Sequence, residues 1–317
     1  MYILLITLLS FFFKLEKESD YLDYHRKVIE IEKLIVENEY QDALNGYKSL
    51  FDTYDFVFVR DYKVAAQLAF KLKLEATAMS FVKMGIRKGW ILEDIKKNKF
   101  LKSALNGIYL KELKSEYYDL RQTLFRNIDL SLKETVHEMF KKDQKKAFGA
   151  LLRIGDKAQT RYSENKFGPH SIDQLKELDK IISENGYPGE RLIGNDIWAS
   201  TILSHHNSIS PDFSRNDTLY PVLKPKLLGA LEKGEISPFE FAVIEDWRIA
   251  VLDRLTGYGF LGPDLTKERL NIVNQNRSRI GMRSIELRNQ LVEIEEKTGM
   301  DFYLLGGPWQ KGLIKID

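Results

Sequence analysis

The stretch SIDQLKELDKIISENGYPGERLIGNDIWASTILSHH, residues 171–206, decides the fold class of this chain. Ser171-x-x-Gln174 has the spacing of a capping box, in which two side chains satisfy free N–H groups at a helix start. Apolar residues then recur every three or four positions up to Gly186, which can end the helix. Pro188-Gly189 suits the centre of a type II turn, and a second apolar helix follows. The stretch therefore predicts helix, turn, helix.

Further helix-start signals follow in the C-terminal half. Ser237-Pro238-Phe239-Glu240 combines a capping box with proline at the first helical position, and Thr266 and Ser284 can each cap another helix. The helix after the second capping box is apolar nearly all round to about Leu255, which is typical of a buried helix. Period-two alternation is confined to Phe56–Val59, which is too short to indicate a sheet. The sequence predicts an all-α fold.

Residues 21–115 repeat one helical pattern. Apolar positions on one pair of helices recur 34 residues later, which is the tetratricopeptide period. The matched positions are Leu44 and Ala78, Tyr47 and Phe81, and Leu50 and Met84. We expect tetratricopeptide-like αα-hairpins here. Because such arrays usually need about three repeats, these two should pack on the helices that follow.

The chain is expected to contain two parts, since its 317 residues exceed one typical domain. The strongly charged segment after Tyr117 follows the hairpins, and we place the boundary near residues 115–126. A helical globular domain should occupy residues 120–300, with a C-terminal tail at 301–317. No linker rich in serine, glycine or proline marks the boundary, so the two parts should dock closely.

Residues 1–14 begin with MYILLITLLSFFF, which is almost wholly apolar. This run is shorter than the roughly 20 residues of a membrane span and has the length of the apolar core of a secretory signal. A preceding basic segment and a small-x-small cleavage site are missing, so a buried N-terminal helix or strand is the alternative. We expect an exported protein or one with N-terminal membrane association, in the periplasm or cell envelope. A cytoplasmic location is the alternative.

Composition excludes several kinds of chemistry. The chain has no cysteine, which rules out disulfides, zinc–thiolate sites, iron–sulfur clusters and thiol nucleophiles. Lys+Arg 48 against Asp+Glu 46 leaves a net charge of +2, and the lysines within 141–146 are interpreted as a solvated helix face. Phosphate-loop, kinase and serine-hydrolase elbow motifs are absent. We expect neither a cofactor nor a nucleic-acid partner.

Four side chains of the C-terminal half are candidates for a polar pocket. His205 would be a general acid/base or a metal ligand, and Asp246 the carboxylate that orients it. Tyr258 lies between two glycines and would donate a proton, while Arg277 would bind an anion. There is no His-Glu-x-x-His motif and no third histidine at ligand spacing, so metal binding stays open. The prediction is that the four side chains meet in one cleft.

Each candidate also has a structural interpretation. The histidine pair at 205–206 suits a helix end, where a cationic side chain favours the helix dipole. Asp246 can instead join a buried ion-pair network with Arg248 and Arg254, since a charge inside an apolar helix is costly unless paired. The glycines around Tyr258 can simply let the loop turn tightly.

Several short motifs between residues 143 and 282 occur in the order of a known bacterial family. They are Asp143-Gln144, Gly186-Tyr187-Pro188, Ile193-Gly194, Ser204-His205-His206, Glu245-Asp246-Trp247, Tyr258-Gly259 and Arg277–Met282. In these motifs the chain resembles the uncharacterised bacterial domain-of-unknown-function family 6624. The family's Tyr-Gly-Thr-Gln motif is only half kept, because Phe260 and Leu261 replace its polar half. The resemblance implies a mainly helical domain and, if the family has a polar pocket, the four candidates as shared members.

Two functions are expected from these features. The first is an exported or envelope-associated interaction or scaffold protein whose hairpins bind a protein or peptide partner in an exposed groove. The groove would be lined by Tyr47, Tyr54, Phe58 and Tyr62. The second is a hydrolase-like enzyme whose pocket holds the four polar candidates. Whether the protein is an enzyme, and its oligomeric state, stay open.

Overall fold

The chain forms an all-helical structure, described here by a computed structural model that is 77% helical. Within the described residues it contains no β-strand, only a parallel bridge between Leu265 and Ile316. The all-α prediction is therefore confirmed. None of the helices in that range is long and apolar enough to span a membrane. The described residues are 20–317 apart from 106, 195–196, 253–256, 262–264 and 305–311.

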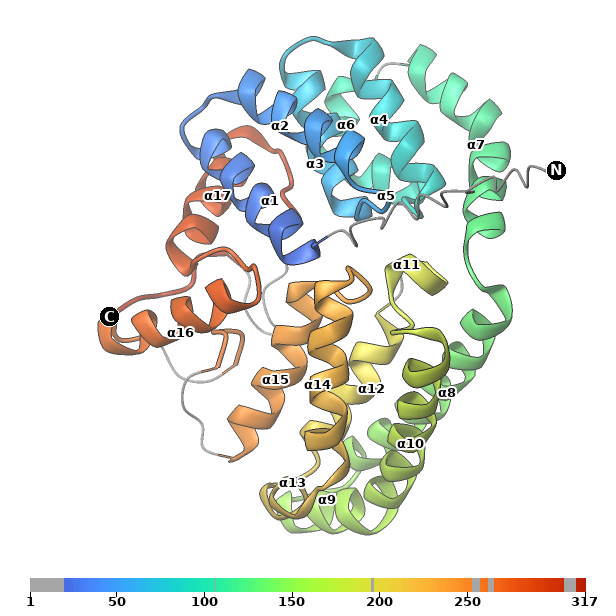
Figure 1. Ribbon diagram of the computed structural model, residues 1–317, viewed down its shortest axis with the longest axis vertical. Coiled ribbons are helices and arrows are strands. Elements are labelled where there is room, and N and C mark those ends of the chain that lie inside the picture. The colour runs from blue at the N-terminus through green and yellow to red at the C-terminus, as the bar shows by residue number, and fades with distance from the viewer. Residues whose placement is uncertain (1–19, 106, 195–196, 253–256, 262–264, 305–311) are drawn as a thin grey trace, which may run out of the picture.

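The first helical body begins with two hairpins that stack on one another (Figure 1). Helix α1 packs on α2, α2 on α3, and α3 on α4. Asn38 and Lys73 take a left-handed conformation, with φ of 62° and 60°, at the turn of each hairpin. Helix α7 packs on α4 and leads into the second body. The helices are α1 (Tyr21–Val36), α2 (Tyr40–Thr53), α3 (Val59–Lys71), α4 (Glu75–Arg87), α5 (Leu92–Lys97), α6 (Lys99–Ala104) and α7 (Gly107–Asn127).

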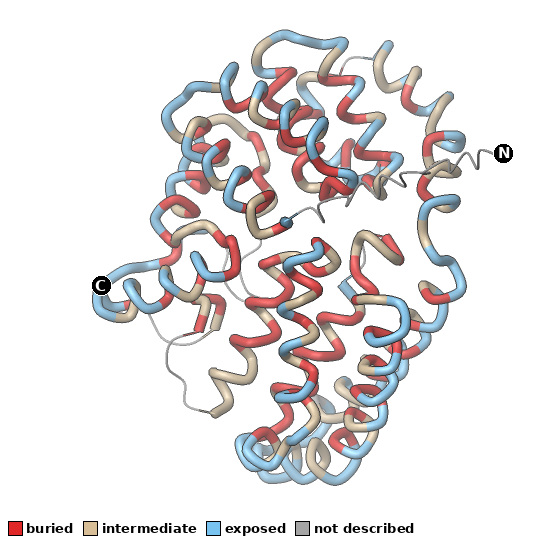
Figure 2. The backbone as a smooth tube through the Cα atoms, viewed as in Figure 1, coloured by how far each residue is buried: buried red, intermediate tan, exposed pale blue. Residues whose placement is uncertain are grey.

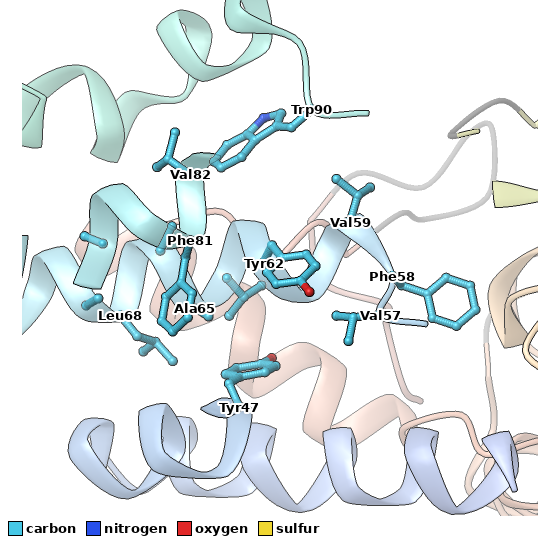
Figure 3. Close-up of a cluster of buried hydrophobic side chains, with 14 of the residues drawn as sticks. Tyr47, Val57, Phe58, Val59, Tyr62, Ala65, Leu68, Phe81, Val82 and Trp90 are labelled. Atoms are coloured by element: carbon cyan, nitrogen blue, oxygen red, sulfur yellow. The ribbon is translucent and has the colours of Figure 1, made fainter. Parts of the chain in front are cut away.

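Aromatic and small side chains fill the interior of the hairpins (Figure 3). The 34-residue register expected from the sequence places buried residues at Leu44, Ala78, Tyr47, Phe81 and Leu50. Met84 departs from it, since this side chain is 37% exposed. The same apolar spacing that makes each helix amphipathic therefore also forms the contact between the hairpins.

The prediction of an exposed aromatic groove on the hairpins is wrong. Tyr47, Tyr54, Phe58 and Tyr62 are all buried. The tilted rings of Phe51 and Tyr62 have centroids 4.4 Å apart, so aromatic contacts hold the hairpins together. These rings therefore belong to the hydrophobic core of the first body and do not line a groove.

The second helical body lies below the first in Figure 1 and has α12 at its centre. Helix α12 packs on α15, α10 and α8, and α10 packs on α14. Buried apolar residues of these five helices form one continuous cluster. The helices are α8 (Leu130–Leu151), α9 (Asp156–Tyr162), the π-helix η1 (Ser163–Phe167), α10 (Gly168–Asn185), α11 (Glu190–Ile193), α12 (Trp198–Asn207), α13 (Pro211–Asn216), α14 (Leu219–Glu232) and α15 (Pro238–Leu252).

The C-terminal helices return to the first body. Helix α16 (Lys267–Arg279) leads to α17 (Ile285–Thr298), and α17 packs on α1. Leu287, Leu291 and Phe302 join the hydrophobic cluster of the hairpins. The core of the first body therefore combines both ends of the described chain, and Figure 2 shows buried segments along both. The division into 21–115, 120–300 and 301–317 stays a prediction.

Some of the helix caps and turns predicted from the sequence are present in the structure, and others are not. Ser237 and Glu240 make the reciprocal bonds of a capping box, and Thr266 and Ser284 cap α16 and α17, as expected. The capping box predicted at Ser171 is wrong, because η1 continues into α10 and residue 171 lies inside the helix. The predicted type II turn is also wrong, since Gly189 has φ of −103°.

Candidate functional site

Asp246, one of the four predicted site residues, anchors the loop that follows α15. Its carboxylate is buried and accepts hydrogen bonds from the N–H groups of Tyr258 (2.5 Å) and Phe260 (2.7 Å). Gly257 permits this approach, because a Cβ atom there would lie 1.8 Å from Oδ1 of Asp246. Burial raises the pKa of Asp246 to about 6, although the two amides and Arg277 oppose the change. The carboxylate is therefore committed to backbone groups of the loop.

Arg277 holds the same loop from α16. Its Nε donates to the carbonyl of Tyr258 at 2.8 Å, and its Nη1 donates to the carbonyl of Arg283 at 3.0 Å. Burial lowers the pKa of Arg277 to about 9, which leaves the side chain cationic at neutral pH. The ring of Tyr258 packs edge-on against Phe241. Asp246, Tyr258 and Arg277 thus form a unit that we call the loop clasp, and their catalytic roles stay predictions.

His205, the fourth predicted residue, lies apart from the loop clasp. Its Nδ1 is 2.5 Å from Oδ2 of Asp143, a fully buried carboxylate on α8, while the His205 side chain remains 27% exposed. The edge of Phe167 faces its ring. None of the hydrogen bonds of His205 to the described residues reaches Asp246 or Arg277. A carboxylate bound to one imidazole nitrogen orients the ring, so this pair suits proton transfer.

Ser171, His206 and Asp217 form a buried chain of polar contacts that sequence reasoning missed. The Ser171 hydroxyl is 2.9 Å from Nδ1 of His206, and Nε2 of His206 is 3.4 Å from Oδ1 of Asp217. Arg248 pairs with Asp217 at 2.9 Å and not with Asp246, while Arg254 lies outside the described residues. Because Ser171 and His206 are almost completely buried, this chain links helices and offers no exposed nucleophile.

A pocket of about 290 Å³ lies between the two helical bodies. It is formed where α1 and α3 face α11, α15 and residues 281–283, the region between the blue and the yellow and orange helices of Figure 1. Its volume is at the lower end of the range for small-molecule sites. The apolar part of its wall includes Val28, Ile29, Phe58, Ile197, Phe239 and Met282. Polar groups come from His25, Arg60, Asp61, Lys63, Glu190, Glu240 and Arg283.

Two of the pocket's cations, Arg60 and Arg283, pair with Glu32, and we call these three residues the Glu32 cluster. Glu32 on α1 is buried and accepts from Nη2 of Arg60 at 2.5 Å and from Nε of Arg283 at 2.6 Å. Arg60 also donates to Asp61 at 3.1 Å and to the carbonyl of Phe302. Burial opposes ionisation of Glu32, yet the two guanidinium groups lower its pKa. The cluster therefore ties α1, α3 and the segment before α17 together.

Lys63 is the pocket's remaining cation and has a different environment. No hydrogen bond or ion pair joins its Nζ to another described residue, and the side chain lines the pocket. Nζ lies 4.6 Å from the ring centroid of Tyr303 and 5.7 Å from that of Trp90. Burial lowers the pKa of Lys63, and Glu190 is the strongest of the acids that oppose this. Lys63 is a partly buried ammonium group whose hydrogen-bonding capacity is unused within the described structure.

Glu190 connects the two bodies at this pocket. As the first residue of α11 it accepts a hydrogen bond at 2.5 Å from the N–H of Val59, the first residue of α3. Burial raises the pKa of Glu190 to about 8, so its carboxyl group is mostly protonated at neutral pH. His25 nearby stays neutral, because burial and the positive charges of Arg283 and Arg60 lower its pKa to about 3. The pocket thus offers an O–H donor beside an ammonium group.

One signal could have pointed to this pocket. Arg60, Asp61 and Lys63 are three charges within four residues at the start of α3, a helix that is otherwise mostly apolar and buried. Such charges need partners when they are buried. Glu32, which pairs with Arg60, and Glu190, which binds the amide of Val59, lie far away in sequence, so spacing alone did not reveal the site.

Comparisons with known proteins leave the site to be interpreted from its geometry. No protein-family model, no curated protein and no solved structure matches the chain. Among the described residues, no group of three or more acidic or histidine side chains is placed to hold a metal ion.

Proposed function

We propose that this protein is a binding protein whose ligand enters the pocket between the two helical bodies. The observation that carries the proposal is the pocket of about 290 Å³ with the unpaired ammonium group of Lys63 on its wall. Concave sites with mostly apolar walls and a few converging polar groups are the usual form of small-molecule sites. The proposal keeps the interaction class expected from the sequence but moves the binding site from the hairpin surface to the pocket.

The hairpins support this function because they form one wall of the pocket. We propose that α1–α4 are tetratricopeptide-like, because they pack as successive hairpins with buried residues in a 34-residue register. Helix α3 supplies Lys63, and its first residue Val59 is bound by Glu190 of the second body. A short peptide end or a small molecule fits the volume better than a whole partner domain. A protein partner could reach the pocket only with a terminal or side-chain group.

The test blocks the pocket at its rim. Ile197 lines the pocket and is 56% exposed, so Ile197→Trp adds bulk without disturbing the core. Val222→Trp is the matched control, since Val222 is 65% exposed on α14 and does not line the pocket. Anionic, cationic and neutral fragments would be screened by NMR of methyl groups. Hits should perturb Val28, Ile29 and Met282, persist in Val222→Trp and disappear in Ile197→Trp. The proposal would be refuted if the fragments bind Ile197→Trp as well as the wild type, or if no fragment perturbs these methyl groups.

A second candidate function is hydrolase-like catalysis at His205. The observation in its favour is the pair of His205 with the buried carboxylate of Asp143, which replaces Asp246 as the orienting acid. Chromogenic carboxylate and phosphate esters would be offered to the protein. His205→Ala and Asp143→Asn should each remove any turnover, while His137→Ala, a histidine stacked on Trp198, should not. Turnover that survives both substitutions would contradict a role for the pair.

We also propose export or N-terminal membrane tethering, and kinship with domain-of-unknown-function family 6624. The apolar run in residues 1–14 supports the first, although it lies outside the described residues. The contact between Asp143 and His205 supports the kinship with family 6624, because these residues belong to two motifs of the resemblance and lie 62 residues apart. Cell fractionation of the full chain and of a variant lacking residues 2–14 tests the location. Equal distribution of the two proteins would contradict export.

A further inference from the structure

We propose that the ligand of the pocket is a monoanionic molecule with an apolar body, whose carboxylate pairs with Nζ of Lys63. The inference deepens the proposed function and rests on it. Three features carry it: the unpaired cation, the commitment of the other charged groups, and the apolar wall.

Lys63 is the cation that a ligand can engage. Each nitrogen of Arg60 already donates, to Glu32, Asp61 and the carbonyl of Phe302, and Arg283 holds Glu32 through two of its three nitrogens. The Nζ of Lys63 lies over the rings of Trp90 and Tyr303 and forms no ion pair with a described residue. An ammonium group that is partly removed from water without an anionic partner is unfavourable, and an incoming anion would offset part of that cost.

The acids of the pocket do not compete for a ligand cation. Asp61 binds the hydroxyl of Tyr24 at 2.5 Å and the guanidinium of Arg60. Glu240 is bound by the N–H and hydroxyl of Ser237 in the capping box. Glu190, with one oxygen on the amide of Val59, carries a proton near neutral pH. Its O–H can donate to an oxygen of the ligand, so the polar end of the pocket is complementary to a carboxylate.

The rest of the ligand would lie against apolar side chains. Val28 and Ile29 of α1, Phe239 of α15 and Met282 all line the pocket. A volume of about 290 Å³ limits this body to a short chain or a single ring. One ammonium group balances one negative charge, which favours a carboxylate over a doubly charged phosphate monoester.

The experiment compares three probes of equal chain length: hexanoate, hexan-1-ol and hexylamine. Calorimetry gives their affinities, and methyl NMR at Val28, Ile29 and Met282 locates them. Hexanoate should bind in the pocket more tightly than the alcohol, and hexylamine should bind least. Lys63→Met should weaken hexanoate by about 10- to 100-fold, as expected for loss of a hydrogen bond to a charged group. Lys63→Arg keeps the charge and should recover most of the affinity.

Lys88→Met is the matched control. Lys88 is also half-buried, with a pKa lowered by burial and Nζ 5.4 Å from the ring centroid of Phe56, but it does not line the pocket. Its substitution should leave hexanoate binding unchanged. Unfolding curves of all variants confirm that they fold, and Lys63→Gln replaces Lys63→Met if the latter does not.

The outcomes separate the two proposals. The carboxylate inference is overturned if hexan-1-ol or hexylamine binds in the pocket more tightly than hexanoate. It is also overturned if Lys63→Met leaves the affinity for hexanoate unchanged. In both cases the pocket remains a binding site. Absence of all three probes from the pocket also overturns the carboxylate inference. Failure of the proposed function is read separately, from the fragment screen with Ile197→Trp and Val222→Trp.

Discussion

The Glu32 cluster and the Lys63–Glu190 region are neighbours at the pocket. The charged groups of the first are paired with one another, whereas the ammonium group of the second has no partner in the described part of the chain. Glu32 is matched by two guanidinium groups through three hydrogen bonds. Lys63 has no such partner among the described residues, and Glu190 is held in a form that is mostly uncharged. Since a buried charge without a partner is destabilising, the comparison separates groups that maintain the fold from groups free to bind a ligand.

The loop clasp belongs with the Glu32 cluster in this comparison. Asp246 and Arg277 were predicted as catalytic groups, but their hydrogen bonds go mostly to loop backbone. Perturbed pKa values occur both there and at Glu190. A shifted pKa alone therefore does not distinguish a structural from a functional group, and the decisive property is unused hydrogen-bonding capacity.

Glu32→Ala should have the largest effect on stability. It leaves the half-buried Arg60 and Arg283 without their buried carboxylate, and breaking a buried ion pair costs about 3–5 kcal/mol. Urea unfolding monitored by circular dichroism measures the change. Glu30→Ala is the control, because Glu30 is exposed on the same helix and pairs only with Lys33. A loss for Glu32→Ala no larger than that of the control would contradict the structural role of the cluster.

Asp246→Ala should follow, with a loss of about 2–3 kcal/mol. Two backbone N–H groups lose their acceptor, and each unsatisfied buried donor costs about 1–3 kcal/mol. The same unfolding measurement applies, with exposed Asp173→Ala as the comparison. Faster hydrogen exchange at Tyr258 and Phe260 would identify the loop as the region affected. Unchanged exchange there would show that the carboxylate does not hold the loop.

The pH dependence of stability should reveal Glu190. Its folded pKa of about 8 lies above the ordinary 4.5, so the folded state binds the extra proton and stability falls as pH rises from about 4.5 to 8. Glu190→Gln should flatten this fall by on the order of 1–3 kcal/mol, less than the full value because the pocket admits water. Unfolding of both proteins at pH 5, 7 and 8.5 gives the difference. Asp246 and Glu295, whose pKa values are raised to about 6 and 7, contribute equally to both proteins. Parallel curves would contradict the assignment.

Lys63→Met should have the smallest effect on the ligand-free protein. The substitution removes an unpaired ammonium group, so stability should change by less than about 1 kcal/mol or rise slightly. Thermal unfolding with and without hexanoate compares the two proteins directly. The ligand should raise the unfolding temperature of the wild type and not that of the variant. A loss as large as that of Glu32→Ala would place Lys63 among the structural charges.

Part of the candidate site could be predicted from the sequence. Asp246, Tyr258 and Arg277 do gather around one loop, because Gly257 lets the backbone approach the carboxylate. His205 was identified as a polar candidate, but Asp143 was not recognised as its partner. The pocket was missed altogether, since Lys63 and Glu190 belong to helices of different bodies and no spacing rule joins them.

By itself, the sequence determined the helices. Apolar spacing, the caps at Ser237, Thr266 and Ser284, and the glycine after α17 act over a few residues, so they can be read locally. Only the tertiary structure decided which charges are paired. Glu32 pairs with Arg60, 28 residues away, and with Arg283, 251 residues away. Such pairs form when distant helices pack, and packing depends on the shapes of whole surfaces, which no short stretch of sequence contains.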